Sequence, residues 1–302
     1  LTEISDARSS GRILYEALRK EGIEVSIEEL SNPGLEIILE KHAPEDTIVF
    51  NLCEALPGIP NSERRVAEII REKGFTYTGN VPEVIELSYD KQKTKELLIS
   101  LGIRVPYGTL LAPDEAASWT IFPAIVKPSR EHCSLTLTEK SVVFDTGSLR
   151  EQIRLVNREL DQPAMVEDFI DGREFHVSLW GNGRVEMLPP AEMDFSAFSD
   201  VHDRLCTYDA KFIPGSVHYE NIHTILPSTL TDGELAELER VCRAAYKAIG
   251  CRDYGRIDVR LRDGAFYVLD INPNPDISED ASMASAAEHV GISHGDMASN
   301  LL

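Results

Sequence analysis

The sequence predicts a protein of mixed helix and sheet, in which an open α/β unit is followed by a small and then a larger α+β unit. Two observations lead to this fold class. Over roughly the first 80 residues, segments with strand and helix periodicity alternate, as they do around an open α/β sheet. After residue 105, strand-like segments follow one another with few helices between them, which is typical of α+β units.

The composition excludes several classes of protein. The chain has 302 residues, with 30 Lys and Arg against 51 Asp and Glu, which gives a formal net charge of −21. Nucleic acids and anionic membranes bind basic patches, so we expect neither as a partner. No run of about 20 apolar residues and no signal peptide is evident, and the five cysteines form no CxxC pair. We therefore expect a soluble cytoplasmic protein without disulfides or a zinc site.

In the N-terminal unit, strand and helix signals follow one another closely. Residues 23–27 are β-prone, and residues 47–52 form the short apolar run of a buried parallel strand. Three helices are expected, each with a capping residue at its start and a glycine at its end. The first runs from Ser9 or Ser10 to Gly22, the second from Asn61 or Ser62 to Gly74, and the third from Asp90 to Gly102.

The two later units are predicted to be rich in strands. The expected strands are 105–111, 124–128, 142–144, 164–169, 173–180, 184–188, 255–262 and 265–271, with helices from Ser148 to about 160, at 231–249 and at 281–290. Residues 192–224 are irregular and too long for an ordinary connection, which predicts a lid or binding loop. We place domains at 1–86, 87–170 and 171–302.

Two strands near the C-terminus carry the most informative motifs, GRIDVRL and YVLDINPNP. Strand alternation places Arg256, Asp258 and Arg260 on one face of the first strand. The second strand ends with Asp270 and Asn272 on one side. Carboxylate and amide oxygens beside an arginine suit the Mg²⁺ of a nucleoside triphosphate. The alternative is that these residues form the solvated face of a hairpin.

Three further residues support a nucleotide site. Lys91 follows a helix cap and Lys127 ends an apolar strand, where a lysine can reach a phosphate as a point charge. Glu167 is followed by alternating apolar positions, which can hold ribose hydroxyls and an adenine. Each signal alone also fits a solvated lysine or an edge-protecting charge.

The order of these residues resembles the ATP-grasp superfamily and, within it, the D-alanine–D-alanine ligase family and its ligase-like relatives. The resemblance extends over nearly the whole chain, from the SSG helix at Ser9 through Tyr77-Thr78-Gly79 to the last helix. It implies an ATP-grasp fold of three domains, with ATP between the central and C-terminal ones. It also implies a homodimer that forms through the N-terminal domain.

The resemblance implies a role for each matched residue. Nucleotide-binding residues are Lys91, Lys127 and Lys211 for the phosphates, Glu167, Phe169 and Ile170 for adenine, and Glu174 for ribose. The Mg²⁺ ligands, with Mn²⁺ as an alternative ion, are Asp258, Asp270 and Asn272. Arg256 matches the arginine that stabilises the acyl-phosphate and tetrahedral intermediates, and Lys211 belongs to the mobile lid.

The departures from the family lie mainly on the substrate side. Asp276 stands where the family places an oxyanion-hole glycine, and Ser282 lies near the position of a serine that holds the substrate carboxylate. Glu54 lies where ligase-like relatives carry an acid near the first substrate. These three are our candidate substrate residues, and we expect Asp276 to hold a substrate ammonium. The phosphate-covering loop 129–136 contains no glycine.

The predicted function is that of an ATP-dependent, ADP-forming carboxylate–amine ligase. It activates a small carboxylate or related acceptor as an acyl phosphate and joins it to an amino acid or other amine. Two alternatives stay open: D-alanine–D-alanine ligase itself, acting in peptidoglycan synthesis, and a non-catalytic nucleotide-binding relative, which the glycine-free loop would suit.

Overall fold

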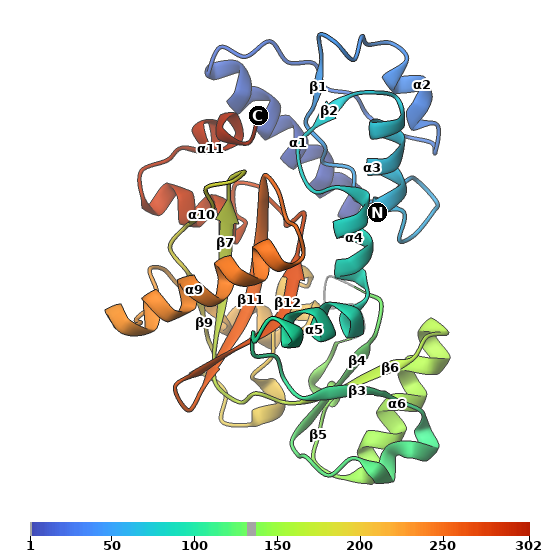
Figure 1. Cartoon of the computed structure of the whole chain (residues 1–302), viewed down its shortest axis with the longest axis vertical. Coiled ribbons are helices and arrows are strands. Elements are labelled where there is room, and N and C mark those ends of the chain that lie inside the picture. The colour runs from blue at the N-terminus through green and yellow to red at the C-terminus, as the bar shows by residue number, and fades with distance from the viewer. Residues whose placement is uncertain (1, 132–136) are drawn as a thin grey trace.

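The protein is described by a computed structural model that covers residues 2–131 and 137–302. Within these residues the strands form three sheets, of two, six and four strands. In Figure 1 the two-stranded sheet lies at the top, the six-stranded sheet in the middle and the four-stranded sheet at the bottom. The predicted fold class of mixed helix and sheet is confirmed.

The N-terminal part is a small parallel sheet with helices around it. Strand β1 (Ile48–Val49) pairs with β2 (Thr76–Tyr77). The helices of the first 90 residues are α1 (Thr2–Lys20), α2 (Leu35–Leu39), α3 (Glu63–Glu72) and α4 (Pro82–Tyr89). The next helix, α5 (Lys91–Ser100), packs on the core of the six-stranded sheet. Helices α2, α3 and α4 share one apolar core with β2. Helix α1 instead packs against α11 (His294–Leu301) near the C-terminus, as Figure 1 shows.

Three expectations for this part are wrong, and the starts of two helices are confirmed, although Ser62 makes no side-chain capping hydrogen bond. Helix α1 begins at Thr2, so the serines at 9 and 10 lie inside the helix and do not cap it. Segment 23–27 pairs with no strand; Ile23 and Val25 pack against the α1–α11 core, and Ile27 is exposed. Only Ile48 and Val49 of the apolar run 47–52 form a strand. Ser62 and Asp90 precede α3 and α5 as predicted.

The four-stranded sheet is antiparallel in the order β3-β6-β4-β5. Its strands are β3 (Gly108–Leu111), β4 (Ala124–Pro128), β5 (Val142–Val143) and β6 (Ala164–Asp168). Helix α6 (Thr146–Leu160) and the short helix η1 (Pro113–Ser118) pack on the sheet over an apolar core. Asp145, and not Ser148, caps α6, because its carboxylate accepts hydrogen bonds from the backbone N–H groups of residues 147 and 148.

The six-stranded sheet follows the order β10-β9-β7-β11-β12, with β8 beside β7. The strands are β7 (Arg173–Trp180), β8 (Glu186–Met187), β9 (Ala191–Asp194), β10 (His223–Ile225), β11 (Tyr254–Arg262) and β12 (Ala265–Asn272). Helix α9 (Asp232–Ala248) packs on the face formed by Ile257, Val259 and Leu261, and α10 (Ser282–His289) follows the sheet. The opposite face of β11 therefore carries its charged residues.

Residues 192–224 are more regular than predicted. They include most of β9, the helices η3 (Val201–Asp203), α7 (Tyr208–Phe212) and α8 (Val217–Asn221), and part of β10. Strand β10 pairs with β9, so both ends of this segment are hydrogen-bonded to each other at the sheet edge. The polar composition that suggested an irregular loop belongs to short, capped helices.

The short segment that follows β2, Gly79 and Asn80, packs against the residues after β12 and so connects the N-terminal part to the six-stranded sheet. Gly79 adopts φ +92°, and a Cβ there would lie 2.6 Å from Oδ1 of Asn274. The same Oδ1 accepts the backbone N–H of Asn80 at 2.8 Å. Arg252 donates to the carbonyl of Gly79 at 2.7 Å. A glycine is therefore required here both for the left-handed backbone and for the close approach.

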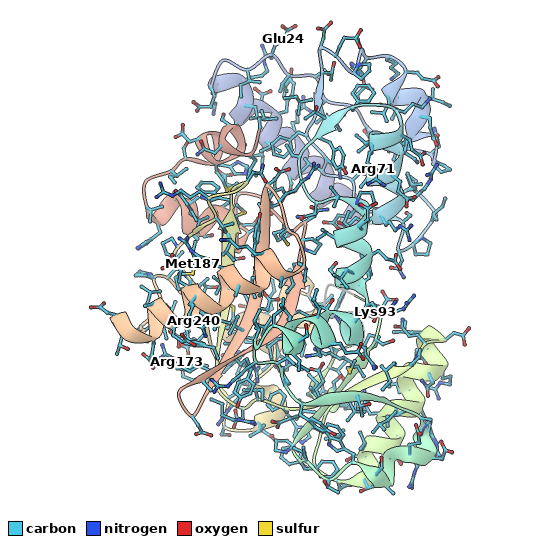
Figure 2. All side chains as sticks on the ribbon, in the orientation of Figure 1. Glu24, Arg71, Lys93, Arg173, Met187 and Arg240 are labelled. Carbon is cyan, nitrogen blue, oxygen red and sulfur yellow. The ribbon has the colours of Figure 1, made fainter. Side chains whose placement is uncertain are left out.

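Charged side chains are dense on the surface. Figure 2 shows Glu24 at the outer edge of the N-terminal part and Lys93 extending from α5. Across the part of the chain that the structure describes, no helix is both long enough and apolar enough to cross a bilayer.

Candidate active site

The hairpin of β11 and β12 brings the four C-terminal site residues together. In the antiparallel register, Arg256 lies opposite Asn272 and Asp258 opposite Asp270. Arg256 binds the Asp258 carboxylate through Nε at 2.7 Å and through a terminal nitrogen at 3.1 Å. The Asn272 amide nitrogen donates to the same carboxylate at 3.1 Å. The three predicted oxygen ligands and the predicted arginine thus share one surface of the hairpin.

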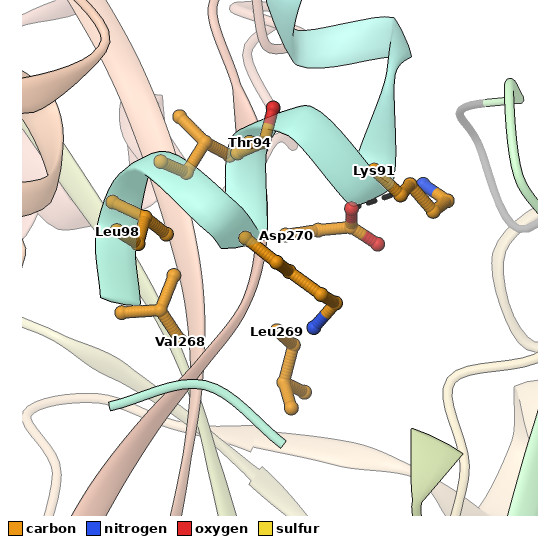
Figure 3. A pocket seen from close by; sticks show the side chains of 8 residues that line it. Lys91, Thr94, Leu98, Val268, Leu269 and Asp270 are labelled. Atoms are coloured by element: carbon orange, nitrogen blue, oxygen red, sulfur yellow. Dashed lines mark hydrogen bonds and ion pairs between the residues drawn. The ribbon is translucent and has the colours of Figure 1, made fainter. Parts of the chain in front are cut away.

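Two lysines from other elements, helix α5 and strand β4, reach this hairpin. Lys91, at the start of α5, binds Asp270 at 2.9 Å, as Figure 3 shows. Lys127, on β4, lies 3.7 Å from the same carboxylate and 3.0 Å from Glu167 on β6. The cavity between α5 and β12 measures only about 10 Å³, which leaves room for at most one water. Lys91 and Asp270, which both line this cavity, are therefore in direct contact.

Lys95 completes this cluster, although the sequence did not single it out. It lies one turn after Lys91 on α5 and forms an ion pair with Glu167 at 3.0 Å. Its position four residues after Lys91, on the same helix face, is the signal that could have identified it. Glu167 is 1% exposed and thus serves as the counter-ion of two buried lysines.

The ionised forms of this cluster depend on one another. Burial opposes the charge of Lys127, but Glu167 and Asp270 raise its pKa above the ordinary value. Burial lowers the pKa of Lys95. The positive charge of Lys127 lowers it further, and the carboxylate of Glu167 partly offsets both effects. Burial also opposes the charge of Glu167, yet the two lysines lower its pKa. With every group ionised, the cluster Lys91, Lys95, Lys127, Glu167 and Asp270 carries one excess positive charge, which suits an anionic ligand.

The donor set on the hairpin fits a hard divalent cation. Two carboxylates and an amide supply the oxygen ligands that Mg²⁺ prefers. Burial opposes the ionisation of Asp258, but Arg256, with His176 and Lys211 farther away, lowers its pKa below the ordinary value. Asp258 therefore remains an anionic ligand at neutral pH.

The hinge between β6 and β7 carries the residues that were expected to contact the nucleoside. Phe169 and Ile170 are almost fully buried there. Gly172 follows, and a Cβ at this position would lie 2.1 Å from the carbonyl oxygen of Leu261. The hinge is thus pressed against β11, where only glycine leaves room for the neighbouring backbone.

Glu174, the expected ribose ligand, is already engaged inside the protein. It lies directly opposite Arg260 in the pairing of β7 with β11. Its Oε2 accepts the Nε–H of Arg260 at 2.7 Å, and its Oε1 lies 3.4 Å from Nε2 of His176. Burial opposes its ionisation, but Arg260 and His176 lower its pKa far below the ordinary value.

Glu174, His176 and Cys206 have ligand atoms within 4.8 Å of one another, which is a metal-like spacing. We assign no metal to them, because Glu174 is the counter-ion of Arg260, whose buried positive charge already compensates the carboxylate. Burial, with Glu174 beside it, raises the pKa of the Cys206 thiol well above its ordinary value.

Lys211 faces the same region from α7. It lies in the segment that was predicted to be a lid. Its positive charge contributes to the lowered pKa of Asp258 and opposes the rise in the pKa of the Cys206 thiol. The glycine-free loop is described only in part, because residues 132–136 lie outside the described residues. Its first residue, Ser129, is buried and accepts the backbone N–H of Lys91.

The three candidate substrate residues are more peripheral. Glu54 and Asp276 are exposed, and Asp276 accepts the backbone N–H of Ser278 at 2.8 Å. Ser282 is the first residue of α10. Near them lies Glu63, a buried carboxyl that the sequence analysis missed. A glutamate in the first turn of a helix is common because it interacts favourably with the helix dipole, so the sequence carries no signal of its burial.

Comparisons with known proteins agree with this geometry. The family model described as "D-ala D-ala ligase C-terminus" matches residues 110–302. The uncharacterized protein y4sG of Sinorhizobium fredii is 31% identical over 282 residues, which covers 89% of this chain and 79% of that protein. The D-alanine–D-alanine ligase of a Marinomonas species is 30% identical over 297 residues, covering 95% and 87% respectively.

Solved structures show the same fold. The crystal structure of D-alanine–D-alanine ligase from Bacillus anthracis complexed with ATP has a TM-score of 0.76 to this chain. It is 18% identical and covers 98% of this chain and 90% of its own. The VanG D-Ala:D-Ser ligase of Enterococcus faecalis has a TM-score of 0.64 and covers 78% of this chain. The predicted ATP-grasp fold is thus confirmed, and the chain belongs to the D-alanine–D-alanine ligase family.

Proposed function

We propose that this protein is an ATP-dependent, ADP-forming ligase that joins a small carboxylate to an amine. The observation that carries the proposal is the convergence of Lys91 and Lys127 with the oxygen donors of the β11–β12 hairpin. Lysines of this kind bind phosphates, while carboxylates beside them hold the accompanying cation. The names of the related ligases support the same reaction class.

Asp258, Asp270 and Asn272 are the residues that would hold Mg²⁺. When bound, Mg²⁺ neutralises charge on the phosphates and so favours phosphoryl transfer. In its absence the charge of Asp270 is compensated by Lys91 at 2.9 Å. Binding of the cation at Asp270 would leave Lys91 available for a phosphate oxygen. The exchange keeps every buried charge compensated, which avoids the cost of an isolated ion.

The reaction needs no protein nucleophile. A carboxylate oxygen of the substrate bonds to the γ-phosphorus of ATP as the bond to the β-phosphate oxygen breaks, and ADP leaves. The amine then attacks the acyl carbon, phosphate departs, and the amine proton passes to solvent. Lys91 and Lys127 bind and orient the phosphates. Arg256, held in place by Asp258, presents a fixed cation to the negative charge that develops on the acyl oxygen.

Segment 192–224 would act as the lid over this site. Lys211 lies within it and already influences the pKa of Asp258, so closure would bring another cation to the phosphates. Exclusion of water would protect the acyl phosphate from hydrolysis. We further propose that residues 1–86, 87–170 and 171–302 act as three domains, and that the chain forms a homodimer.

The decisive experiment measures ADP and phosphate release from Mg-ATP over a panel of amino acids, offered singly and in pairs. Mass spectrometry of positive reactions identifies the product. Lys91→Ala should reduce release at least a hundredfold, because it removes a fixed phosphate ligand. Lys93→Ala is the matched control, since Lys93 lies on the same helix but is exposed and pairs with Asp90. Equal activity of the two variants would refute the assignment of Lys91.

The panel also identifies the substrates. The departures at Asp276 and Ser282 support substrates other than two molecules of D-alanine. Release with D-alanine alone would instead favour D-alanine–D-alanine ligase itself. Binding of Mg-ATP without release in any well would favour a non-catalytic relative.

A further inference from the structure

Every carboxylate on the metal-ligand face of the hairpin is paired with a cation of the protein itself. The Lys91 ammonium, whose side chain is 5% exposed, lies 2.9 Å from Oδ1 of Asp270. Lys127 lies 3.7 Å from Oδ2 of the same carboxylate. Asp258 is held by Arg256 through both of its oxygens. A divalent cation that binds here therefore meets positive charges that are already in place.

Lys91 opposes such a cation by its charge and not by filling the space. The carboxylate of Asp270 keeps lone pairs that could bind a metal, but any ion that shares this carboxylate lies close to the Lys91 ammonium. Lys95, which interacts electrostatically with Asp270, adds to the repulsion. At a partly buried site, repulsion between neighbouring like charges weakens binding by about tenfold or more.

Movement of Lys91 away from Asp270 does not solve this conflict. Among the residues that the structure describes, Asp270 is the one carboxylate that forms an ion pair with Lys91. An ammonium that gives up this partner to a metal is left without a counter-ion at a site with little access to water. A phosphate group removes the conflict, because its oxygens can bind the metal and also accept the ammonium. The metal is thus far more stable here with a phosphate than without one.

We propose that Lys91, through its ion pair with Asp270, prevents a divalent cation from binding to the hairpin alone, so that the cation binds only together with the phosphates of a nucleotide. The inference rests on the proposed function, since it concerns the metal and the nucleotide of that same site. Lys91 thereby determines the form in which the site accepts the metal, in addition to its contact with the phosphates. Its removal should create a metal site that is independent of nucleotide.

The test consists of two titrations of the full chain. In the first, Mn²⁺ is added without nucleotide, and the free ion is counted by electron paramagnetic resonance. In the second, the preformed Mn²⁺ complex of the β,γ-imido analogue of ATP is added, and its binding is measured by calorimetry. The net charge of −21 attracts some Mn²⁺ to the surface, so Asp270→Asn supplies the background for the first titration. Above this background the wild type should bind no Mn²⁺ up to about 1 mM, but it should bind the nucleotide complex.

Variants assign the effect to Lys91. Lys91→Met should bind free Mn²⁺ about tenfold more tightly than the wild type, because the repulsion is removed, and the nucleotide complex about tenfold more weakly, because a phosphate ligand is lost. A general loss of structure would weaken both, so the opposite changes identify the charge. Combining Lys91→Met with Asp270→Asn should abolish the gain. Lys93→Met is the matched control, since Lys93 lies on the same helix, is exposed and pairs with Asp90. Both of its dissociation constants should equal those of the wild type.

The outcomes are distinct. Binding of free Mn²⁺ by the wild type above the Asp270→Asn background would overturn the inference and leave the proposed function standing. The same conclusion would follow if Lys91→Met bound free Mn²⁺ no more tightly than the wild type. Failure of the wild type to bind the nucleotide complex would refute the proposed function, and the inference with it. If Lys91→Met does not fold, Lys91→Gln takes its place, because glutamine removes the charge but keeps a hydrogen-bond donor for Asp270.

Discussion

Glu63→Gln tests the consequence of burying a carboxyl next to the candidate substrate residues. Glu63 is 9% exposed and accepts hydrogen bonds from Asn274 at 2.7 Å and from the Tyr89 hydroxyl at 3.2 Å. Burial raises its pKa to about 7, and the charge of Glu54 contributes to the rise. The two hydrogen bonds lower the pKa but do not offset burial. The folded protein thus keeps a proton on Glu63 that the unfolded chain releases at lower pH.

The magnitude follows from proton linkage. The pKa rises on folding from 4.5 to about 7. The unfolded chain binds fewer protons between these values, so the free energy of unfolding falls as pH increases. The stability is full below pH 4.5 and levels off above pH 7. Each unit of pKa difference between the folded and unfolded states corresponds to about 1.4 kcal/mol, so the free energy of unfolding falls by about 3 kcal/mol over the whole range. Glutamine resembles the protonated carboxyl in shape and avoids this loss.

The assay is denaturant unfolding of the wild type and Glu63→Gln at pH 5, 6, 7 and 8. Relative to the wild type, the variant should become more stable by about 2.5 kcal/mol between pH 5 and pH 8, which is most of the full linkage. Glu72→Gln is the matched control, because Glu72 lies on the same helix with its side chain 61% exposed. Its difference from the wild type should not change with pH. A pH-independent difference for Glu63→Gln would refute the reasoning.

Three further outcomes are expected. Glu167→Gln removes the counter-ion of two buried lysines and should lower the free energy of unfolding by about 3 to 5 kcal/mol; a loss below about 1 kcal/mol would contradict the buried ion pairs. Gly79→Ala should destabilise the protein more than Gly22→Ala. Both glycines have positive φ, but only at position 79 would the new Cβ meet a neighbouring atom, Oδ1 of Asn274. Equal denaturation midpoints of the two variants would exclude this close approach. Asn272→Ala should raise the Mg²⁺ concentration needed for half-maximal ADP release about tenfold or more, and an unchanged titration would remove it from the metal site.

Much of the architecture could be predicted because its signals are local. Strands β4, β7, β11 and β12 have long runs of the appropriate periodicity, and their observed bounds lie within one residue of the expected ones. The weaker signals failed where tertiary packing decided. Segment 23–27 has strand-like residues but pairs with no strand, and two of its apolar side chains, Ile23 and Val25, pack instead on the core between α1 and α11.

The sequence by itself determined which residues share the face of the hairpin that we propose binds the metal. The side chains of a strand alternate with period two, so Arg256 and Asp258 had to share a face, and a short turn had to bring Asp270 and Asn272 beside them. Only the tertiary structure decided how Glu174 is used, because its partner Arg260 is 86 residues away and meets it through the register of β7 with β11. Burial and long-range pairing are properties of the assembled chain, and local periodicity does not contain them.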